Sequence, residues 1–264
     1  MINKCTTRDR RPYRLIKSIV GLLTLLILSA CASVSTVTQH DPWEPMNRSI
    51  YAFNEAIDSA VLRPVATTYI AVTPVPVVQG ISNFFSNLGD LWSFFNNALQ
   101  FKPLEAASSL GRFGVNTVIG LVGIFDVATS IGIERHTEDF GQTLGYWGLS
   151  SGPYVVIPLL GPSSVRDAAG TIVEMQYSVL SNMEDKTTKN SLQLLNGVNR
   201  RSELLQASAL VDQVALDKYT FVRDGYLGHR RNLVLDGSLS EEIWGLGLKK
   251  IDGVSSDESI KEIK

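Results

Sequence analysis

Residues 83–101 read NFFSNLGDLWSFFNNALQF, and their alternation of amide and aromatic side chains decides the fold class. The amides are Asn83, Asn87, Asn96, Asn97 and Gln100, and the aromatic residues are Phe84, Phe85, Trp92, Phe94, Phe95 and Phe101. This mixture is typical of short amphipathic helices that lie in or against one leaflet of a bilayer, with aromatic groups at the interface. The stretch therefore predicts helices that are partly embedded in a membrane leaflet.

The sequence around this stretch is poor in charge. Residues 72–165 contain nine charged residues, whereas residues 166–264 contain 28. An ordinary soluble domain carries charge along its whole length, because every helix has an outer face in water. The pattern indicates either contact of residues 72–165 with a membrane or an unusually buried core with a small polar surface. Prolines and glycines interrupt the apolar runs before they reach twenty residues, so spanning helices are not expected.

The first thirty residues have the composition of a secretory signal. Six basic residues precede an apolar run over residues 19–28, which is too short to span a bilayer unaided. The segment LSAC at 28–31 resembles the lipobox of bacterial lipoproteins, in which cleavage before the cysteine is coupled to its acylation. We therefore expect a cleaved signal at 1–30, lipid attachment at Cys31 and a lipidated tether over 31–40. An ordinary signal peptide with a chance cysteine, or a retained membrane anchor, are the alternatives.

The mature chain that begins at Cys31 is acidic. It has 18 basic and 25 acidic residues, a formal charge of −7, so no basic surface for nucleic acid is expected. Cys31 is its only cysteine, which leaves no disulfide framework. Ala32 stands where an aspartate retains many Gram-negative lipoproteins in the inner membrane. The expected location is therefore the outer membrane, lipid-anchored on its periplasmic side.

Periodicity predicts a single all-α domain over residues 41–250, followed by a disordered, charged tail at 251–264. Helices are expected at about 46–58, 77–87, 90–100, 104–118 and 164–180, and two further apolar stripes follow between residues 192 and 226. Only Tyr154–Ile157 has the composition of a strand, and prolines bracket it.

Residues 140–161 carry no charge and contain Gly141, Gly145, Gly148 and Gly152 at spacings of four, three and four. The glycines form one bare face if the segment is helical, and a helix or an acyl chain could approach the backbone there. An irregular loop is the alternative. Because glycine lowers resistance to bending, the segment is a candidate hinge that gates a lipid path.

One pattern suggests an enzyme. Residues 148–152 match G-x-S-x-G around Ser150, and Asp212 and His229 follow in the order of a serine hydrolase. A nucleophile elbow needs a strand before the serine and a helix after it, whereas the strand-like run here comes after it. No metal-binding, phosphate-binding or dinucleotide motif occurs in the sequence. We therefore expect no enzymatic activity, no catalytic or metal-binding residues, and no cofactor beyond the acyl groups on Cys31.

Several collinear motifs carry a resemblance to a known family. They are DPWEPMNR at 41–48, Phe53-Asn54, RPVA at 63–66, GISNF at 80–84, Arg112-Phe113, Asn116-Thr117, GIFDVA at 123–128, FGQTLG at 140–145, GPY at 152–154 and Arg166-Asp167. Together they resemble the MlaA (VacJ) family of outer-membrane lipoproteins over residues 41–235, nearly the whole mature chain.

The resemblance implies a ring-like helical protein that maintains outer-membrane lipid asymmetry. Members of the family take misplaced phospholipids from the outer leaflet and deliver them to a soluble periplasmic lipid carrier, and they associate with trimeric outer-membrane porins. The candidate lipid path or gate in this chain comprises Asn83, Phe84, Phe94, Phe95, Gly141, Gly145, Gly148 and Gly152. Two other functions stay open: a structural porin-associated lipoprotein without transport, and a serine lipase or esterase that uses Ser150.

Overall fold

The computed structural model describes residues 41–237. The predicted signal at 1–30, lipid attachment at Cys31, the tether at 31–40 and the tail at 251–264 lie outside the described residues.

The described residues are mostly helical, which confirms the predicted class. The helices are α2 (Glu44–Ile57), a π-helical turn (Asp58–Leu62), α3 (Arg63–Val72), α4 (Val75–Leu99), α5 (Pro103–Val118), α6 (Val127–Ser130), α7 (Phe140–Tyr146), α8 (Val165–Tyr177), a 3-10 turn (Leu180–Asn182), α9 (Lys186–Glu203), α10 (Leu205–Val214) and α11 (Lys218–Val234). One antiparallel hairpin joins β1 (Tyr154–Ile157) to β2 (Gly161–Ser164), with Tyr154 paired to Ser164 and Ile157 to Gly161.

Helix boundaries follow local side-chain chemistry. Prolines occupy the first turns of α2, α3, α4 and α5, where a missing N–H leaves no hydrogen bond unmade. Side-chain oxygens of the residues before α6, α7, α8, α9 and α11 accept hydrogen bonds from backbone N–H groups of the first turn. These capping residues are Asp126, Asp139, Ser164, Asp185 and Asp217, and they explain why the helices begin where they do.

Two expectations about secondary structure were wrong. The predicted break between residues 87 and 90 does not occur, because α4 runs through Gly89 and its packing against α5 outweighs the helix propensity of glycine. Strand β2 was not predicted, since Gly161-Pro162-Ser163-Ser164 contains none of the residues that favour strands. The predicted strand Tyr154–Ile157 and the helix near 104–118 are confirmed.

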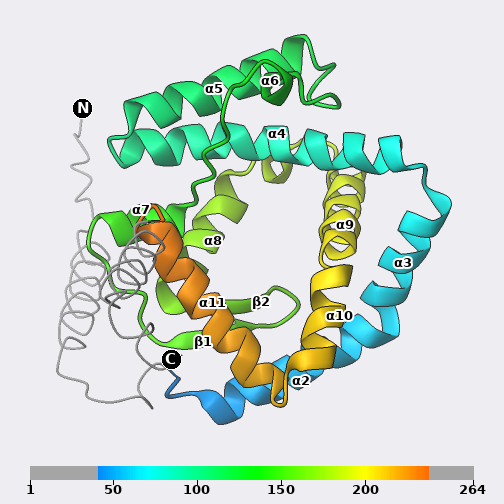
Figure 1. The fold of residues 1–264 in the computed structure, drawn as a ribbon, viewed down its shortest axis with the longest axis vertical. Coiled ribbons are helices and arrows are strands. Elements are labelled where there is room, and N and C mark those ends of the chain that lie inside the picture. The colour runs from blue at the N-terminus through cyan, green and yellow to red at the C-terminus, as the bar shows by residue number, and fades with distance from the viewer. Residues whose placement is uncertain (1–40, 238–264) are drawn as a thin grey trace, which may run out of the picture. The chain divides into compact units, whose positions relative to one another are not determined.

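The elements contact one another in a closed circuit (Figure 1). Helix α4 packs on α5, α7 and α9; α9 packs on α3, and the π-helical turn continues α3 into α2. Helix α2 then packs on β1, while α11 contacts both β2 and α7 and returns to α4 through α7. The circuit agrees with the ring-like arrangement that the family resemblance implies.

Asparagines of α2 hold the free edge of the hairpin. Asn47 is fully buried; its Nδ2 donates to the Tyr154 carbonyl at 3.0 Å, and its Oδ1 accepts from the Val156 N–H at 2.9 Å. Asn54 does the same two turns later, with the Ile157 carbonyl at 3.0 Å and the Leu159 N–H at 2.8 Å. These bonds satisfy the backbone groups that a two-stranded sheet leaves unpaired.

Candidate functional site

Helices α4 and α5 bury polar side chains between them and expose apolar ones, the inverse of a helix pair in water. Their buried residues are mostly polar: Asn87, Asp90, Ser93, Asn96 and Asn97 on α4, and Ser109, Arg112 and Asn116 on α5. Large apolar residues of the pair and of the turns beside it are exposed instead. We call these the apolar belt: Phe101, Leu104, Val118, Ile119, Leu121, Val122, Ile124, Phe125 and Ile131.

The inversion decides between the two explanations of the charge-poor region. A buried apolar core would place these side chains inside, yet Leu104 and Val118 are 80% and 79% exposed. In the described part of the chain, the buried hydrophobic residues are only Ala66, Ala106, Ala128, Tyr154, Val156, Leu180 and Tyr219. Apolar side chains outside and paired polar groups inside suit a helix pair with lipid around it. No described helix has the length and hydropathy needed to cross a bilayer.

The buried polar residues of α4 connect it to residues 136–143. Gln100 Nε2 donates to Glu138 Oε2 at 2.8 Å, and Thr143 Oγ1 donates to Asn96 Oδ1 at 2.8 Å. Lys102 Nζ lies 3.1 Å from Glu138 Oε1 at the end of this row. The amide side chains that the sequence places between the aromatic residues thus fix α7 against α4.

A buried ion cluster joins α5 to α4 and α6. Arg112 is 1% exposed, and its Nη2 donates to both carboxylate oxygens of Asp126, at 2.9 and 3.0 Å. Its Nε lies 3.4 Å from Asp90 Oδ2, and Arg135 Nε lies 3.1 Å from Asp90 Oδ1. Burial raises the pKa of Asp90 despite both arginines. Burial also opposes ionisation of Asp126, but hydrogen bonds from Thr129 and Asn116 and the charge of Arg112 lower its pKa to about 2.

Asp126 makes the stability of the fold depend on acid pH. An aspartate in an unfolded chain has a pKa of about 3.9, whereas Asp126 in the folded chain has a pKa of about 2. The stability that its ionised form contributes is therefore complete above about pH 5 and is lost as the pH falls through about 2. We expect the free energy of unfolding, from urea titrations, to fall more steeply between about pH 4 and pH 2 in the wild type than in Asp126→Asn. Parallel curves would contradict this assignment.

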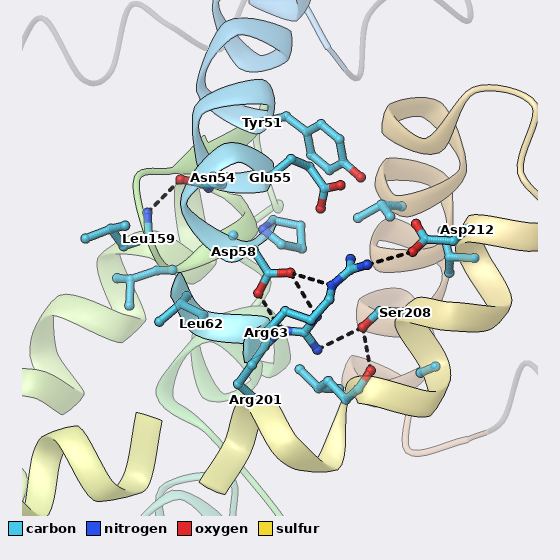
Figure 2. A pocket seen from close by; sticks show the side chains of 17 residues that line it. Tyr51, Asn54, Glu55, Asp58, Leu62, Arg63, Leu159, Arg201, Ser208 and Asp212 are labelled. Atoms are coloured by element: carbon cyan, nitrogen blue, oxygen red, sulfur yellow. Dashed lines mark hydrogen bonds and ion pairs between the residues drawn. The ribbon is translucent and has the colours of Figure 1, made fainter. Parts of the chain in front are cut away.

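A cavity of about 400 Å³ lies where α2, the β1–β2 turn, α10 and α11 meet (Figure 2). Its size is within the range of small-molecule sites. Its apolar lining comes from elements far apart in the sequence: Leu62, Leu159, Leu160, Leu204, Ala207, Val211 and Val222. Leu159 and Leu160 project from the hairpin turn with much of their surface exposed, so an apolar chain could enter beside them.

Four of the five charged residues that line this cavity, Asp58, Arg63, Arg201 and Asp212, form ion pairs with one another. Arg201 Nη2 donates to Asp58 Oδ2 at 2.9 Å, and Arg63 bridges Asp58, at 3.3 Å, and Asp212, at 3.1 Å (Figure 2). The hydrogen bond from Arg201 lowers the pKa of Asp58, and that from Lys218 lowers the pKa of Asp212. The cavity thus combines apolar walls, this ion-pair network and the carboxylate of Glu55. Arg63 belongs to a quoted motif. Its partner Asp58 lies five residues before it, whereas Asp212 lies 149 residues away and was named only in the hydrolase pattern.

The residues proposed for the lipid path do not converge on one place. Asn83 Nδ2 donates to the Ile124 carbonyl at 2.9 Å and so fixes the turn that carries part of the apolar belt. Phe84 packs edge-to-face on Phe85, and Phe94 packs on Phe95, which is half exposed. Phe95 lines a cavity beside α4 that is described below. Whether these residues contact lipid stays a prediction.

The glycine-rich segment is helical only in its first part. Gly141 and Gly145 lie in α7, while Gly148 and Gly152 have φ values of +91° and +68°, outside any helix. The prediction of a continuous helical face of four glycines is therefore wrong. A Cβ on Gly141 would lie 2.6 Å from Asp167 Oδ1, and one on Gly145 would lie 2.7 Å from Arg166 Nη1. Both glycines make room for the ion pairs of α8, and movement of residues 140–161 stays a prediction.

Because α7 and α8 approach closely, we expect alanine at Gly170 and alanine at Gly197 to change the free energy of unfolding in opposite directions. A Cβ on Gly170 would lie 2.6 Å from the backbone nitrogen of Gly141, whereas the corresponding position on Gly197 in α9 is open. We expect Gly170→Ala to lower the free energy of unfolding by about 1–3 kcal/mol through overpacking. Gly197→Ala should raise it by about 0.5–1 kcal/mol, because alanine favours the helix. Urea titrations measure both, and equal effects would show that α7 and α8 are not in backbone contact.

The hydrolase pattern lacks the required structural context. Ser150 is exposed and lies between α7 and β1, so a helix precedes it and a strand follows it, the reverse of a nucleophile elbow. Asp212 pairs with Arg63 and Lys218, and no contact joins it to Ser150 or His229 among residues 41–237. The geometry therefore gives no support to Ser150 as a nucleophile. No group of three or more histidine, cysteine or acidic residues within 41–237 is placed to hold a metal.

Comparison with known proteins assigns the chain to a family. Residues 39–233 match the family model described as MlaA lipoprotein. An "Intermembrane phospholipid transport system lipoprotein MlaA" from Shigella flexneri is 35% identical over 217 residues, which cover 80% of this chain and 85% of that protein. The protein of the same name from Haemophilus influenzae is 30% identical over 248 residues, covering 89% of this chain and 98% of the relative.

The fold agrees with a solved structure described as "Structural basis for maintenance of bacterial outer membrane lipid asymmetry". The two share 32% sequence identity with a TM-score of 0.65, over 74% of this chain and 98% of the solved one. Family model, sequence relatives and fold all cover most of the chain and agree. The chain therefore belongs to the MlaA lipoprotein family.

Proposed function

We propose that this protein transports phospholipids between membranes, removing misplaced phospholipids from the outer leaflet of the outer membrane and passing them to a soluble periplasmic carrier. The observation that carries the proposal is the inversion of α4 and α5, whose exposed apolar belt suits one leaflet of a bilayer. The names of the relatives from Shigella flexneri and Haemophilus influenzae, which describe phospholipid transport lipoproteins, support it.

Different parts of the chain anchor the protein, contact the leaflet and accommodate the phospholipid. Acyl groups on Cys31 anchor the protein to the periplasmic side of the outer membrane, and each buried methylene adds about 0.8 kcal/mol to that attachment. The apolar belt then places α4 and α5 in the leaflet. A phospholipid needs an apolar route for its chains and a polar route for its head group, and the cavity of Figure 2 supplies apolar walls beside satisfied ion pairs.

Directionality and access come from other proteins. Without a motif for nucleotide hydrolysis in the sequence, a periplasmic lipid carrier supplies the sink for the phospholipid. A trimeric porin holds the protein in the outer membrane beside its substrate. Residues 140–161 open and close the path, with the loop around Gly148 and Gly152 as the flexible part.

Mass spectrometry of the purified mature protein, with and without its porin, tests transport against a purely structural role. We expect phospholipid to co-purify with the protein. Cys31→Ala should leave an uncleaved precursor without acyl label and expose phospholipid in the outer leaflet, whereas the matched change Cys5→Ala, in the discarded segment, should alter neither. A mature protein that binds porin but never carries phospholipid would favour the structural role. Normal acylation of Cys31→Ala would contradict the lipid attachment site.

A further inference from the structure

Two cavities of opposite character adjoin between α4 and α9. One is polar, has a volume of about 210 Å³ and is lined by Ser82, Asp90, Arg135 and Glu203 among others. The second, of about 230 Å³, is lined mainly by apolar side chains, including Leu88, Leu91, Trp92, Phe95 and Leu180. Phe85, Gly89, Asn196 and Arg200 line both, so the two volumes meet along one boundary. An amphipathic ligand could occupy both at once.

Two opposite charges on α9 face the polar cavity without a charged partner. Arg200 forms no ion pair or side-chain hydrogen bond with residues 41–237, and Glu203 forms no ion pair with a lysine or arginine of that range. Asp90 and Arg135 on the opposite wall pair with each other. With respect to residues 41–237, the cavity therefore offers one cation and one anion that have no charged partner.

The carboxylate of Glu203 is held in place from behind. Its Oε1 accepts from Ser82 Oγ at 2.6 Å and from Asn199 Nδ2 at 3.0 Å. Asn199 is buried, and its Oδ1 accepts from the hydroxyl of Tyr69 at 3.1 Å. These neutral donors position the carboxylate without cancelling its charge, so it stays available to a cationic group.

Asn196 adds an unsatisfied acceptor at the boundary. Its Oδ1 is buried and has no hydrogen-bond partner, although the residue lines both cavities. Buried acceptors are normally paired, and an unpaired one is costly. A ligand that brings N–H donors to this boundary would satisfy it.

We propose that this site binds a zwitterionic phospholipid whose head group ends in a primary ammonium, an inference that rests on the proposed transport function and specifies its substrate. Arg200 binds the phosphate, since a guanidinium matches two phosphate oxygens at once. The ammonium, with three donors, binds Glu203 and Asn196. The first part of an acyl chain lies against Leu88, Leu91 and Trp92. An anionic head group with an alcohol in place of the ammonium would face the unpaired carboxylate.

The test compares lipids with identical acyl chains in neutral detergent micelles. Native mass spectrometry of the full mature chain would measure bound phosphatidylethanolamine, phosphatidylglycerol and phosphatidylcholine. We expect phosphatidylethanolamine to bind about tenfold more tightly than the other two. Glu203→Gln should remove that preference, and Arg200→Gln should weaken all three lipids by about tenfold or more. Lys186→Gln removes the same charge from an exposed position at the start of α9 and serves as the matched control.

The outcomes separate this site from the proposed function. Equal binding of the three lipids by the wild type would overturn the head-group assignment, and so would a preference that survives Glu203→Gln in a chain with unchanged thermal unfolding. Undiminished binding by Arg200→Gln would overturn the site while leaving transport intact. A wild type that carries none of the lipids would contradict the transport function itself, and with it this inference.

Discussion

Replacing Arg112 by methionine is expected to lower the free energy of unfolding by about 3–5 kcal/mol, because Asp126 and the Ile133 carbonyl lose their buried partner and the buried Asp90 keeps only Arg135. Arg112 is 1% exposed and binds Asp126 through two oxygens, while its Nη1 donates to the Ile133 carbonyl at 2.6 Å. Methionine keeps the length of the stem but satisfies none of these acceptors. Urea titration at neutral pH measures the loss.

Arg48 provides the matched control for this substitution. It also pairs with two carboxylates, those of Glu44 and Asp217, but its side chain is 42% exposed. Exposed ion pairs contribute little, because water replaces the lost partner. Arg48→Met should therefore cause a far smaller change than Arg112→Met. Similar losses for the two variants would show that the Arg112 cluster is hydrated rather than buried.

Two lysines in the apolar belt are expected to reduce membrane binding by about a hundredfold or more. Val118 and Ile119 are exposed at the end of α5, so Val118→Lys with Ile119→Lys should leave the fold intact. A charge moved into the hydrocarbon region costs several kcal/mol, and two such charges oppose insertion of the whole belt. The measurement is co-flotation of a non-acylated Cys31→Ser chain with uncharged phosphatidylcholine vesicles.

Helix α10 supplies the control for this experiment. Gln206→Lys with Gln213→Lys adds the same charge at two exposed positions outside the belt, and vesicle binding should stay at the level of the unsubstituted chain. A comparable loss for both double variants would indicate that total charge, rather than the belt, governs binding.

The amphipathic character of α4 was predictable, because the amide and aromatic residues of 83–101 alternate with helical spacing and residues 83–101 carry only one charge. Burial of the amide side was not, because the sequence left open whether this region contacts a membrane or forms a core. The continuity of α4 across Gly89 was not, since it depends on packing against α5, which no local pattern encodes. The same holds for β2, where the hairpin partner and the asparagines of α2 impose a strand on a sequence with little preference for one.

The cavities were harder to predict than the helices. Asp58 and Arg201 lie 143 residues apart, and each is indistinguishable in the sequence from an ordinary charge on a solvated helix face. Arg200 and Arg201 are neighbours in the sequence, yet one is bound in an ion pair and the other faces a cavity. The difference between the two arginines depends on how the helices pack, which the sequence does not reveal. Gly141 was likewise predicted to belong to a flexible face of glycines, whereas it lies in close backbone contact with Gly170 of α8.

The apolar belt also affects the solubility of this protein before the belt contacts lipid. Contiguous exposed apolar surface promotes association between copies, and the belt has no covering element among residues 41–237. Leu121 and Val122 at its tip even adopt positive φ values of 51° and 60°, a conformation that disfavours a β-branched side chain, and hold those side chains outward. Correct folding therefore produces the aggregation-prone surface rather than removing it. In water the belt therefore stays exposed until lipid or another apolar surface covers it.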